Sequence, residues 1–227
     1  MTTADIRAEL QQNIDEQYKA FHASLVPGIG TFLGVRVPKL REIAKKAAKE
    51  DYQTFFSEAD VTVYEELMIR GMMIGYAKLT LEQQKQELER FIPYINNWAI
   101  CDCCCATYKF MKKNQEEWLE FLKTYLKKEE EYEVRFAIVC LLDFFIHELY
   151  IDEVLELLAD SRHDAYYVKM ADAWALSVCY IRFPQKTEPI LERETLDFDI
   201  RKKAVQKIRE SLRISKEEKE RLKKKFY

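Results

Sequence analysis

The chain has 227 residues, of which 48% are hydrophobic and 33% are charged, and its net charge at pH 7 is -3. This composition excludes a disordered chain and is sufficient to bury a hydrophobic core. Only 5 Gly and 5 Pro are present, which is too few for the many turns of an all-β or α/β protein of this length. Composition therefore favours helices, and the net charge gives no argument for a nucleic-acid partner.

The sequence shows no targeting or metal-binding pattern. The segment after Met1 is polar, and no apolar run approaches about 18 residues, so we expect a cytoplasmic protein without a membrane span. In that compartment the six cysteines are expected to be thiols. Four of them are too crowded for a metal-binding pair, and the histidines lack ligand spacing to them. We expect no metal, and these four are best explained as small apolar packing residues: Cys101, Cys103, Cys104 and Cys105.

Residues 1–60 are expected to form helices joined by a glycine-rich elbow. An apolar stripe from Ile6 to Leu25 predicts one long amphipathic helix over residues 4–26. The elbow, residues 27–38, lacks the Gly-Lys-Ser/Thr of a phosphate loop and is interpreted as structural. Its final residue, Pro38, predicts the start of a helix running to Lys49, and a short helix is expected over 52–59.

Helical segments then recur in pairs from residue 61 to the C-terminus. Paired units begin near residues 62, 97, 131, 165 and 197, roughly every 34 residues, which is typical of an α-solenoid. The tetratricopeptide consensus is missing, so a HEAT-like repeat is the better description. We predict a single all-α domain over residues 1–227, a superhelix of about five helix pairs, whose apolar first helices line one concave face.

The segment NNWAICD, residues 96–102, is the first candidate site. Trp98 and Asp102 are four residues apart, so on a helix they share one face. Asn96 and Asn97 indicate a helix start, because Asn side chains cap unpaired N–H groups. An aromatic face beside a carboxylate suits a cationic ligand or transition state. The alternative is a half-buried Trp with a solvated Asp near a helix N-terminus.

Two further residues are expected beside this pair. Arg135 lies one repeat after Asp102, and Trp174 lies about one repeat after Arg135, each within an apolar run. In a stack of repeats, such positions become neighbours on successive inner helices. The alternatives are an ion pair of Arg135 with Asp102 or Asp143, and core filling by Trp174. One track carrying Trp, Asp, Arg and Trp is less easily explained as core.

The C-terminal segment 197–227 differs in charge from the rest of the chain. It holds 12 Lys/Arg against 6 Asp/Glu, whereas residues 1–196 are net acidic. Such a segment can be an anion-binding edge. The alternative is an ordinary solvated helix face.

These motifs, in this order, resemble the AlkD-type DNA alkylation repair family, which is built from HEAT-like repeats. The resemblance rests on FLGVRVPKLR at the elbow, NWAICD, EVRFAI and MADAWAL. It implies that the family's site roles fall on Trp98, Asp102, Arg135 and Trp174. Two positions depart from the family: the stretch FHASLVPGIGTFLG has no obvious equivalent of a site Tyr, and Ser177 stands where relatives carry a basic residue.

The resemblance implies a cofactor-free DNA glycosylase that excises N3- and N7-alkylated purines from duplex DNA without flipping the base. Asp102 would stabilise an oxocarbenium-like sugar and orient the attacking water. Trp98 and Trp174 would flank the deoxyribose. Arg135 would bind an adjacent phosphate. The alternative is a non-catalytic helical-repeat protein that binds branched or damaged DNA, or a protein partner.

Further contacts to the DNA backbone are expected from basic side chains at helix ends, and the protein is expected to be a monomer. Lys109 is a candidate because it follows Asp102 by seven residues and would share its helix face. Together with Arg135, the candidates for phosphate binding are Arg36, Lys39, Lys109, Lys203 and Lys207.

Overall fold

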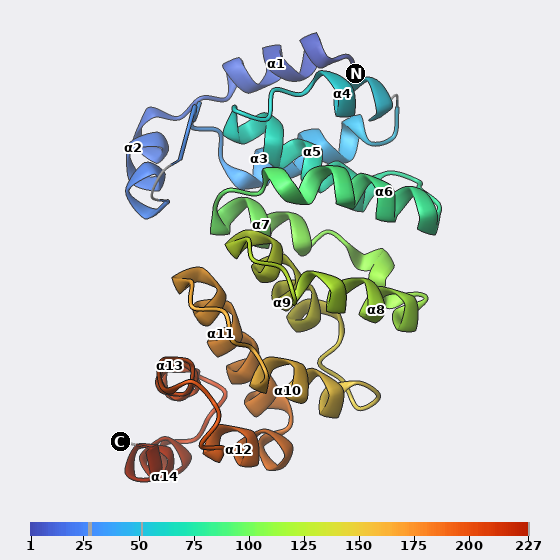
Figure 1. The fold of residues 1–227 in the computed structure, drawn as a ribbon. Helices are drawn as coiled ribbons and strands as arrows, with labels where there is room; N and C mark the ends of the chain where they lie inside the picture. Colours follow the sequence, from blue (N-terminus) through green and yellow to red (C-terminus); the bar gives the residue numbers. More distant parts are fainter. Residues whose placement is uncertain (27–28, 51, 227) are drawn as a thin grey trace. The chain divides into compact units, whose positions relative to one another are not determined.

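The computed structural model describes residues 1–26, 29–50 and 52–226, and every described regular element is helical (Figure 1). The extended contacts found there are two isolated bridges, Ile14 with Val35 and Thr31 with Val63. The all-α prediction is confirmed. Among the described residues, no helix is long and apolar enough to cross a membrane.

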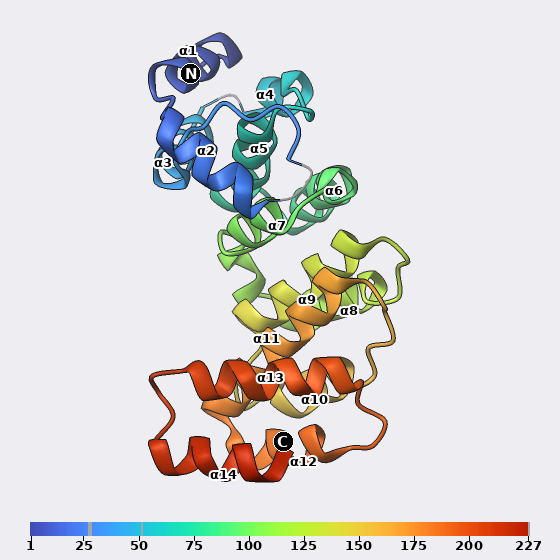
Figure 2. The same cartoon turned by 90° about the vertical axis from the view of Figure 1, so that its left-hand side faces the viewer.

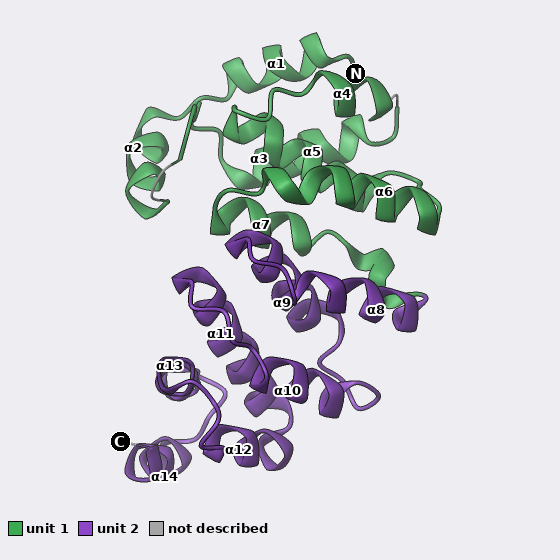
Figure 3. Cartoon of the chain, in the orientation of Figure 1, with its two compact units in different colours: residues 1–113 green, residues 114–227 purple. Residues whose placement is uncertain are grey.

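The chain divides into two compact units, Met1–Lys113 and Asn114–Tyr227 (Figure 3). The organisation as one domain stays a prediction. The helices of unit 1 are α1 (Thr3–Gln12), α2 (Glu16–Leu25), α3 (Val37–Ala47), α4 (Tyr52–Glu58), α5 (Tyr64–Tyr76), α6 (Leu81–Phe91), η1 (Ile92–Tyr94), α7 (Trp98–Cys105) and η2 (Lys109–Lys112). Those of unit 2 are α8 (Gln115–Tyr125), α9 (Glu131–Phe144), α10 (Ile151–Ala159), α11 (Tyr166–Arg182), α12 (Pro184–Glu192), α13 (Phe198–Glu210) and α14 (Lys216–Phe226).

The predicted helix pairs correspond closely to the observed ones. Units expected near residues 62, 97, 131, 165 and 197 begin with α5, α7, α9, α11 and α13, each within two residues of the expected start. The short helices expected at 39–49 and 52–59 are α3 and α4, with Pro38 in the first turn of α3. The packing of consecutive helices is that of a helical repeat array.

The single long helix predicted over residues 4–26 is wrong. The chain breaks between α1 and α2, where the Asp15 side chain accepts the amide of Tyr18 at 2.9 Å and caps α2. The Asp15 amide in turn donates to the carbonyl of Gly34 at 3.1 Å. The apolar stripe is continuous across the break, but these tertiary and capping hydrogen bonds end the first helix.

The elbow is organised by a buried carboxylate from α5. Glu65, 0% exposed, accepts the backbone amides of Leu33, Gly34 and Val35 at 2.8–3.2 Å. Gly34 has φ +100°, a conformation that favours glycine, and a Cβ there would lie 2.7 Å from the Cβ of Lys19. The elbow is structural in residues 29–38, and the Pro27-Gly28 part of the prediction lies outside the described residues.

Unit 1 is built around α5, which packs against α3 and α7. Two glycines on α5 allow this close packing. A Cβ on Gly71 would lie 2.3 Å from Phe91 and 2.5 Å from the sulfur of Cys104, and a Cβ on Gly75 would lie 2.2 Å from Thr107. Only glycine fits at these positions, so α5 sets the position of α7 and of the turn that follows it.

Unit 2 is built around α11, which packs against α9 and α13. The N-terminal ends of the three helices lie at one edge. The rings of Tyr132 and Tyr167 are 5.7 Å apart across α9 and α11, and Lys169 pairs with Asp197 at 2.9 Å across α11 and the start of α13. These first helices therefore run in the same direction. Figure 2 shows α13 and α14 side by side, joined by the loop over residues 211–215.

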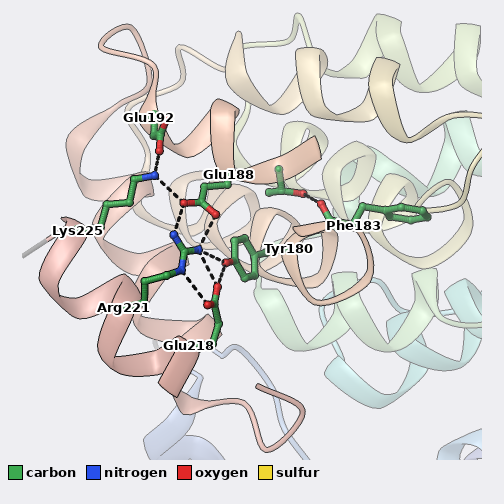
Figure 4. Close-up of polar contacts among 8 residues, drawn as sticks. Tyr180, Phe183, Glu188, Glu192, Glu218, Arg221 and Lys225 are labelled. Atoms are coloured by element: carbon green, nitrogen blue, oxygen red, sulfur yellow. Dashed lines mark hydrogen bonds and ion pairs between the residues drawn. The ribbon is translucent and has the colours of Figure 1, made fainter. Parts of the chain in front are cut away.

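The last helix, α14, buries only Leu222 and is held mainly by charge (Figure 4). Arg221 binds both oxygens of Glu188 at 2.6–2.7 Å, and it also binds Glu218 and the hydroxyl of Tyr180. Lys225 adds a contact to Glu188 at 2.6 Å. The hydrogen bond from Arg221 lowers the pKa of Glu188 to about 2. Part of the basic C-terminal segment is thus used inside unit 2.

Candidate functional site

The first candidate pair lies at the start of α7 in unit 1. Asn97 is the N-cap, and its side-chain oxygen accepts the amide of Ile100 at 3.0 Å. Trp98 is the first residue of the helix and Asp102 lies one turn later, and both side chains are partly exposed. The predicted cap and the shared helix face are confirmed, so an indole and a carboxylate reach solvent from the same turn.

Trp98 has a fixed orientation that the sequence did not indicate. Its indole N–H donates to the carbonyl oxygen of Leu25, the last residue of α2, at 3.2 Å. This hydrogen bond spans 73 residues. It joins the end of α2 to the beginning of α7, so the indole is anchored at its nitrogen.

An aromatic cluster, formed by Tyr18, His22, Phe32 and Tyr64, holds α2 in place. His22 stacks on Tyr18 with ring centroids 5.1 Å apart, and its Nε2 lies 2.9 Å from the Tyr64 hydroxyl. The Phe32 ring packs against both residues, with its centroid 5.2 Å from that of His22 and 5.0 Å from that of Tyr64. Burial lowers the pKa of His22, which favours its neutral form. The Tyr18–His22 spacing is a helical one that could have revealed part of this cluster.

Three of the four cysteines of α7 face the interior. Cys101, Cys104 and Cys105 are 0% exposed, and the Cys104 thiol donates to the Met68 carbonyl on α5 at 3.5 Å. Burial raises the pKa of Cys103 to about 11 and raises the pKa of Cys104 well above its usual value. For the three buried residues the predicted packing role is confirmed, and Cys103 is partly exposed. Within the described part of the chain, no group of three His, Cys, Asp or Glu residues is arranged to hold a metal.

The other two candidates belong to adjacent helices of unit 2. Arg135 on α9 is 6% exposed and donates from Nη1 to the Tyr167 carbonyl at 2.7 Å. Its guanidinium lies 6.0 Å from the Tyr167 ring centroid. Trp174 on α11 is partly exposed, and the Ser177 hydroxyl donates to its carbonyl at 2.7 Å. The arrangement of Trp98, Asp102, Arg135 and Trp174 on one track stays a prediction.

The two basic candidates near the elbow already have carboxylate partners. Arg36 donates to Asp15 at 2.9 Å and lies over the Tyr18 ring at 5.0 Å. Lys39 bridges Glu9 at 2.7 Å and Glu42 at 3.1 Å. A phosphate contact by either residue would require exchange of these partners.

The remaining basic candidates differ in their positions. Lys109 was expected to share the helix face of Asp102, and this is wrong because α7 ends at Cys105 and Lys109 begins η2. Its side chain is exposed. Lys203 and Lys207 are both partly exposed and lie one turn apart on α13, with Lys203 donating to Gln206 at 3.3 Å. These two lysines share a helix face.

Paired helices with this packing define the protein as a helical-repeat protein. The family model for DNA alkylation repair enzymes matches residues 6–214. The chain therefore belongs to the DNA alkylation repair enzyme family. The comparison with curated proteins and the comparison with solved structures each gave no match.

Proposed function

We propose that the protein is a DNA glycosylase that excises N3- and N7-alkylated purines from duplex DNA, without a cofactor and without flipping the base. The observation that carries this proposal is the pair on α7. In a member of a DNA alkylation repair family, Trp98 and Asp102 emerge from one turn of a capped helix, with the indole anchored to Leu25.

The reaction requires mainly electrostatic stabilisation from the protein. Alkylation at N3 or N7 makes the purine cationic, so the base is already a good leaving group. Cleavage of its glycosidic bond leaves positive charge on the sugar, as in glycoside hydrolysis. The Asp102 carboxylate is suited to stabilise that charge and to orient a water molecule for attack.

Aromatic and basic groups support this step. The faces of Trp98 and Trp174 would flank the deoxyribose, each favouring the sugar cation by about 0.5–2 kcal/mol. Arg135 would hold a neighbouring phosphate with a charge-assisted hydrogen bond. Its burial and its bond to the Tyr167 carbonyl restrict its rotation, so less entropy is lost on binding.

Binding of the DNA backbone would extend over basic side chains, and the protein would act as a monomer. Lys109, Lys203 and Lys207 reach solvent, whereas Arg36 and Lys39 would exchange carboxylates for phosphates. Affinity should therefore fall steeply with salt, since each phosphate contact releases counterions.

The test is release of N7-methylguanine or N3-methyladenine from methylated duplex DNA. Asp102→Asn keeps the shape of the side chain and removes its charge. We expect a loss of at least about 2–3 kcal/mol of transition-state stabilisation, roughly a 30- to 160-fold slower reaction. Glu89→Gln, which removes an exposed carboxylate from α6 of the same unit, is the matched control and should leave the rate unchanged.

Equal rates for wild type and Asp102→Asn would contradict the role of Asp102. If the wild type released no base but still bound DNA, the glycosylase proposal would fail in favour of a non-catalytic DNA-binding repeat protein.

A further inference from the structure

Unit 2 contains a cavity of about 530 Å³, and neither Arg135 nor Trp174 is among the residues that line it. Its walls come from the end of α8 and the residues that follow it, from α9 and α10, and from the loop between α10 and α11. Its apolar surface is formed by Leu126, Val134 and Leu157. The volume lies in the range of sites for small organic molecules, about 300–1,000 Å³.

Four basic side chains line this cavity: Lys123, Lys127, Lys128 and Arg162. Lys123 is neutralised by Glu120 at 2.6 Å and Glu153 at 2.5 Å. The other three are less compensated.

The Lys128 amine is 4.0 Å from the partly buried Glu133, and Arg162 is 3.7 Å from the exposed Asp160, both near the outer limit of an ion pair. An exposed pair such as Arg162 with Asp160 contributes little, about 0–1 kcal/mol. Lys127 is exposed beside them. One carboxylate, Asp160, lines the cavity with these three cations, which leaves an excess of positive charge.

The wall of the cavity is fixed by His163. Its Nε2 donates to the Glu129 carbonyl at 2.9 Å, while its Nδ1 accepts the Ala165 amide at 3.1 Å. This tautomer is set by its two partners. Arg162 also donates to the Ala159 carbonyl at 2.9 Å. The loop is therefore held in shape before any ligand arrives.

A buried acid lies behind this wall. The Ser161 hydroxyl, which lines the cavity, donates to Oδ2 of Asp172 at 2.7 Å. Asp172 is 0% exposed, and its Oδ1 has no hydrogen-bond partner among the described residues. Burial raises its pKa to about 8, so at neutral pH the group is mostly uncharged and does not repel an anion.

We propose that this cavity binds a small phosphomonoester that carries an aromatic group. The phosphate lies between Lys127, Lys128 and Arg162, where charge-assisted hydrogen bonds are available. The aromatic group covers Leu126, Val134 and Leu157, where apolar area leaves water. The three cations alone would bind a small anion weakly, because water and salt ions compete for them. The apolar surface is therefore needed as well.

Isothermal titration of the whole protein with naphthyl phosphate tests this site. Inorganic phosphate and naphthol each supply one half of the ligand. We expect one naphthyl phosphate per chain, and binding of either half at least about tenfold weaker. Equal affinity for inorganic phosphate, or no binding of naphthyl phosphate, would overturn the proposal.

Charge-reversal variants provide a second test of this site. The double variant Lys127→Glu/Arg162→Glu should lose at least about tenfold in affinity. Lys223→Glu/Lys224→Glu reverses two exposed cations on α14 of the same unit and should bind as wild type does. Unaltered affinity in the first variant would overturn the site.

Thermal unfolding checks that each variant is folded. Leu157→Asn removes part of the apolar surface without a change of charge, so it tests the apolar half of the site independently. Excision of methylated bases should continue in all of these variants, which separates this proposal from the glycosylase proposal.

Discussion

The indole N–H of Trp98 donates to the carbonyl oxygen of Leu25 at 3.2 Å, and this contact links two helices that the sequence keeps far apart. Leu25 ends α2, and the next residue, Val26, is fully buried. The position of the acceptor is therefore fixed by the core of unit 1. The orientation of the indole beside Asp102 depends on this anchor.

Trp98→Phe keeps an aromatic face and removes the donor. We expect the free energy of unfolding to fall by about 0.5–1.5 kcal/mol, the net value of one hydrogen bond, and base excision to slow because the ring is no longer anchored. Urea denaturation and the release assay measure the two effects. Tyr94→Phe, at an exposed ring of the same unit, is the control. Wild-type behaviour of Trp98→Phe in both assays would show that the anchor is unimportant.

Gly71→Ala should destabilise unit 1. The added Cβ would lie 2.3 Å from Phe91 and 2.5 Å from the Cys104 sulfur, and Phe91 is itself fully buried and cannot move aside. Overpacking of this kind costs about 1–3 kcal/mol. Because α7 must shift away from α5, excision should fall as well.

Gly30→Ala is the matched substitution, since its Cβ would meet only the Thr62 carbonyl at an ordinary 3.4 Å. Chemical denaturation of both variants makes the comparison. Equal stability of the two would mean that the α5–α7 contact adjusts freely.

The helical array was predictable because its signal is repeated. Each inner helix carries an apolar run, and caps or prolines mark the starts, as Asn97 does for α7 and Pro38 for α3. The break between α1 and α2 was not predictable from periodicity. It depends on Asp15, whose side chain caps α2 while its amide pairs with Gly34, and only the folded elbow brings that partner close.

Less of the candidate site could be predicted. The spacing of Trp98 and Asp102 on one turn follows from local sequence, and so does the Asn97 cap. The Leu25 acceptor could not be inferred, because every residue has a backbone carbonyl and the sequence does not show which one accepts a hydrogen bond. The prediction that Asp102 and Lys109 share a helix face was wrong for a related reason. The helix ends at Cys105, and no glycine or proline in the sequence marks that end.

Asp172→Asn should stabilise the protein at neutral and alkaline pH. Burial raises the pKa of Asp172 to about 8 in the folded state, against an ordinary value of 3.8. The unfolded chain then releases this proton more readily, so the stability of the wild type falls as pH rises from about 4 to about 8. Asparagine cannot ionise and can still accept from Ser161.

Thermal unfolding of wild type and variant across this pH range provides the test for Asp172. The gain in melting temperature should grow from near zero at low pH to a plateau above about pH 8. A difference that is independent of pH would show that ionisation of Asp172 is not the cause. Asp199→Asn, at an exposed carboxylate of the same unit, should show no such growth.

Arg135→Ala should have two separable effects. Removing the guanidinium leaves the Tyr167 carbonyl without this donor, which should lower the free energy of unfolding by about 1–3 kcal/mol. If Arg135 also holds a phosphate, DNA binding should weaken and the slope of log affinity against log salt should flatten by roughly 0.9. Lys223→Ala, an exposed cation on α14, should change neither the stability nor the slope. A less stable variant with an unaltered slope would identify Arg135 as a residue that positions Tyr167 rather than one that contacts DNA.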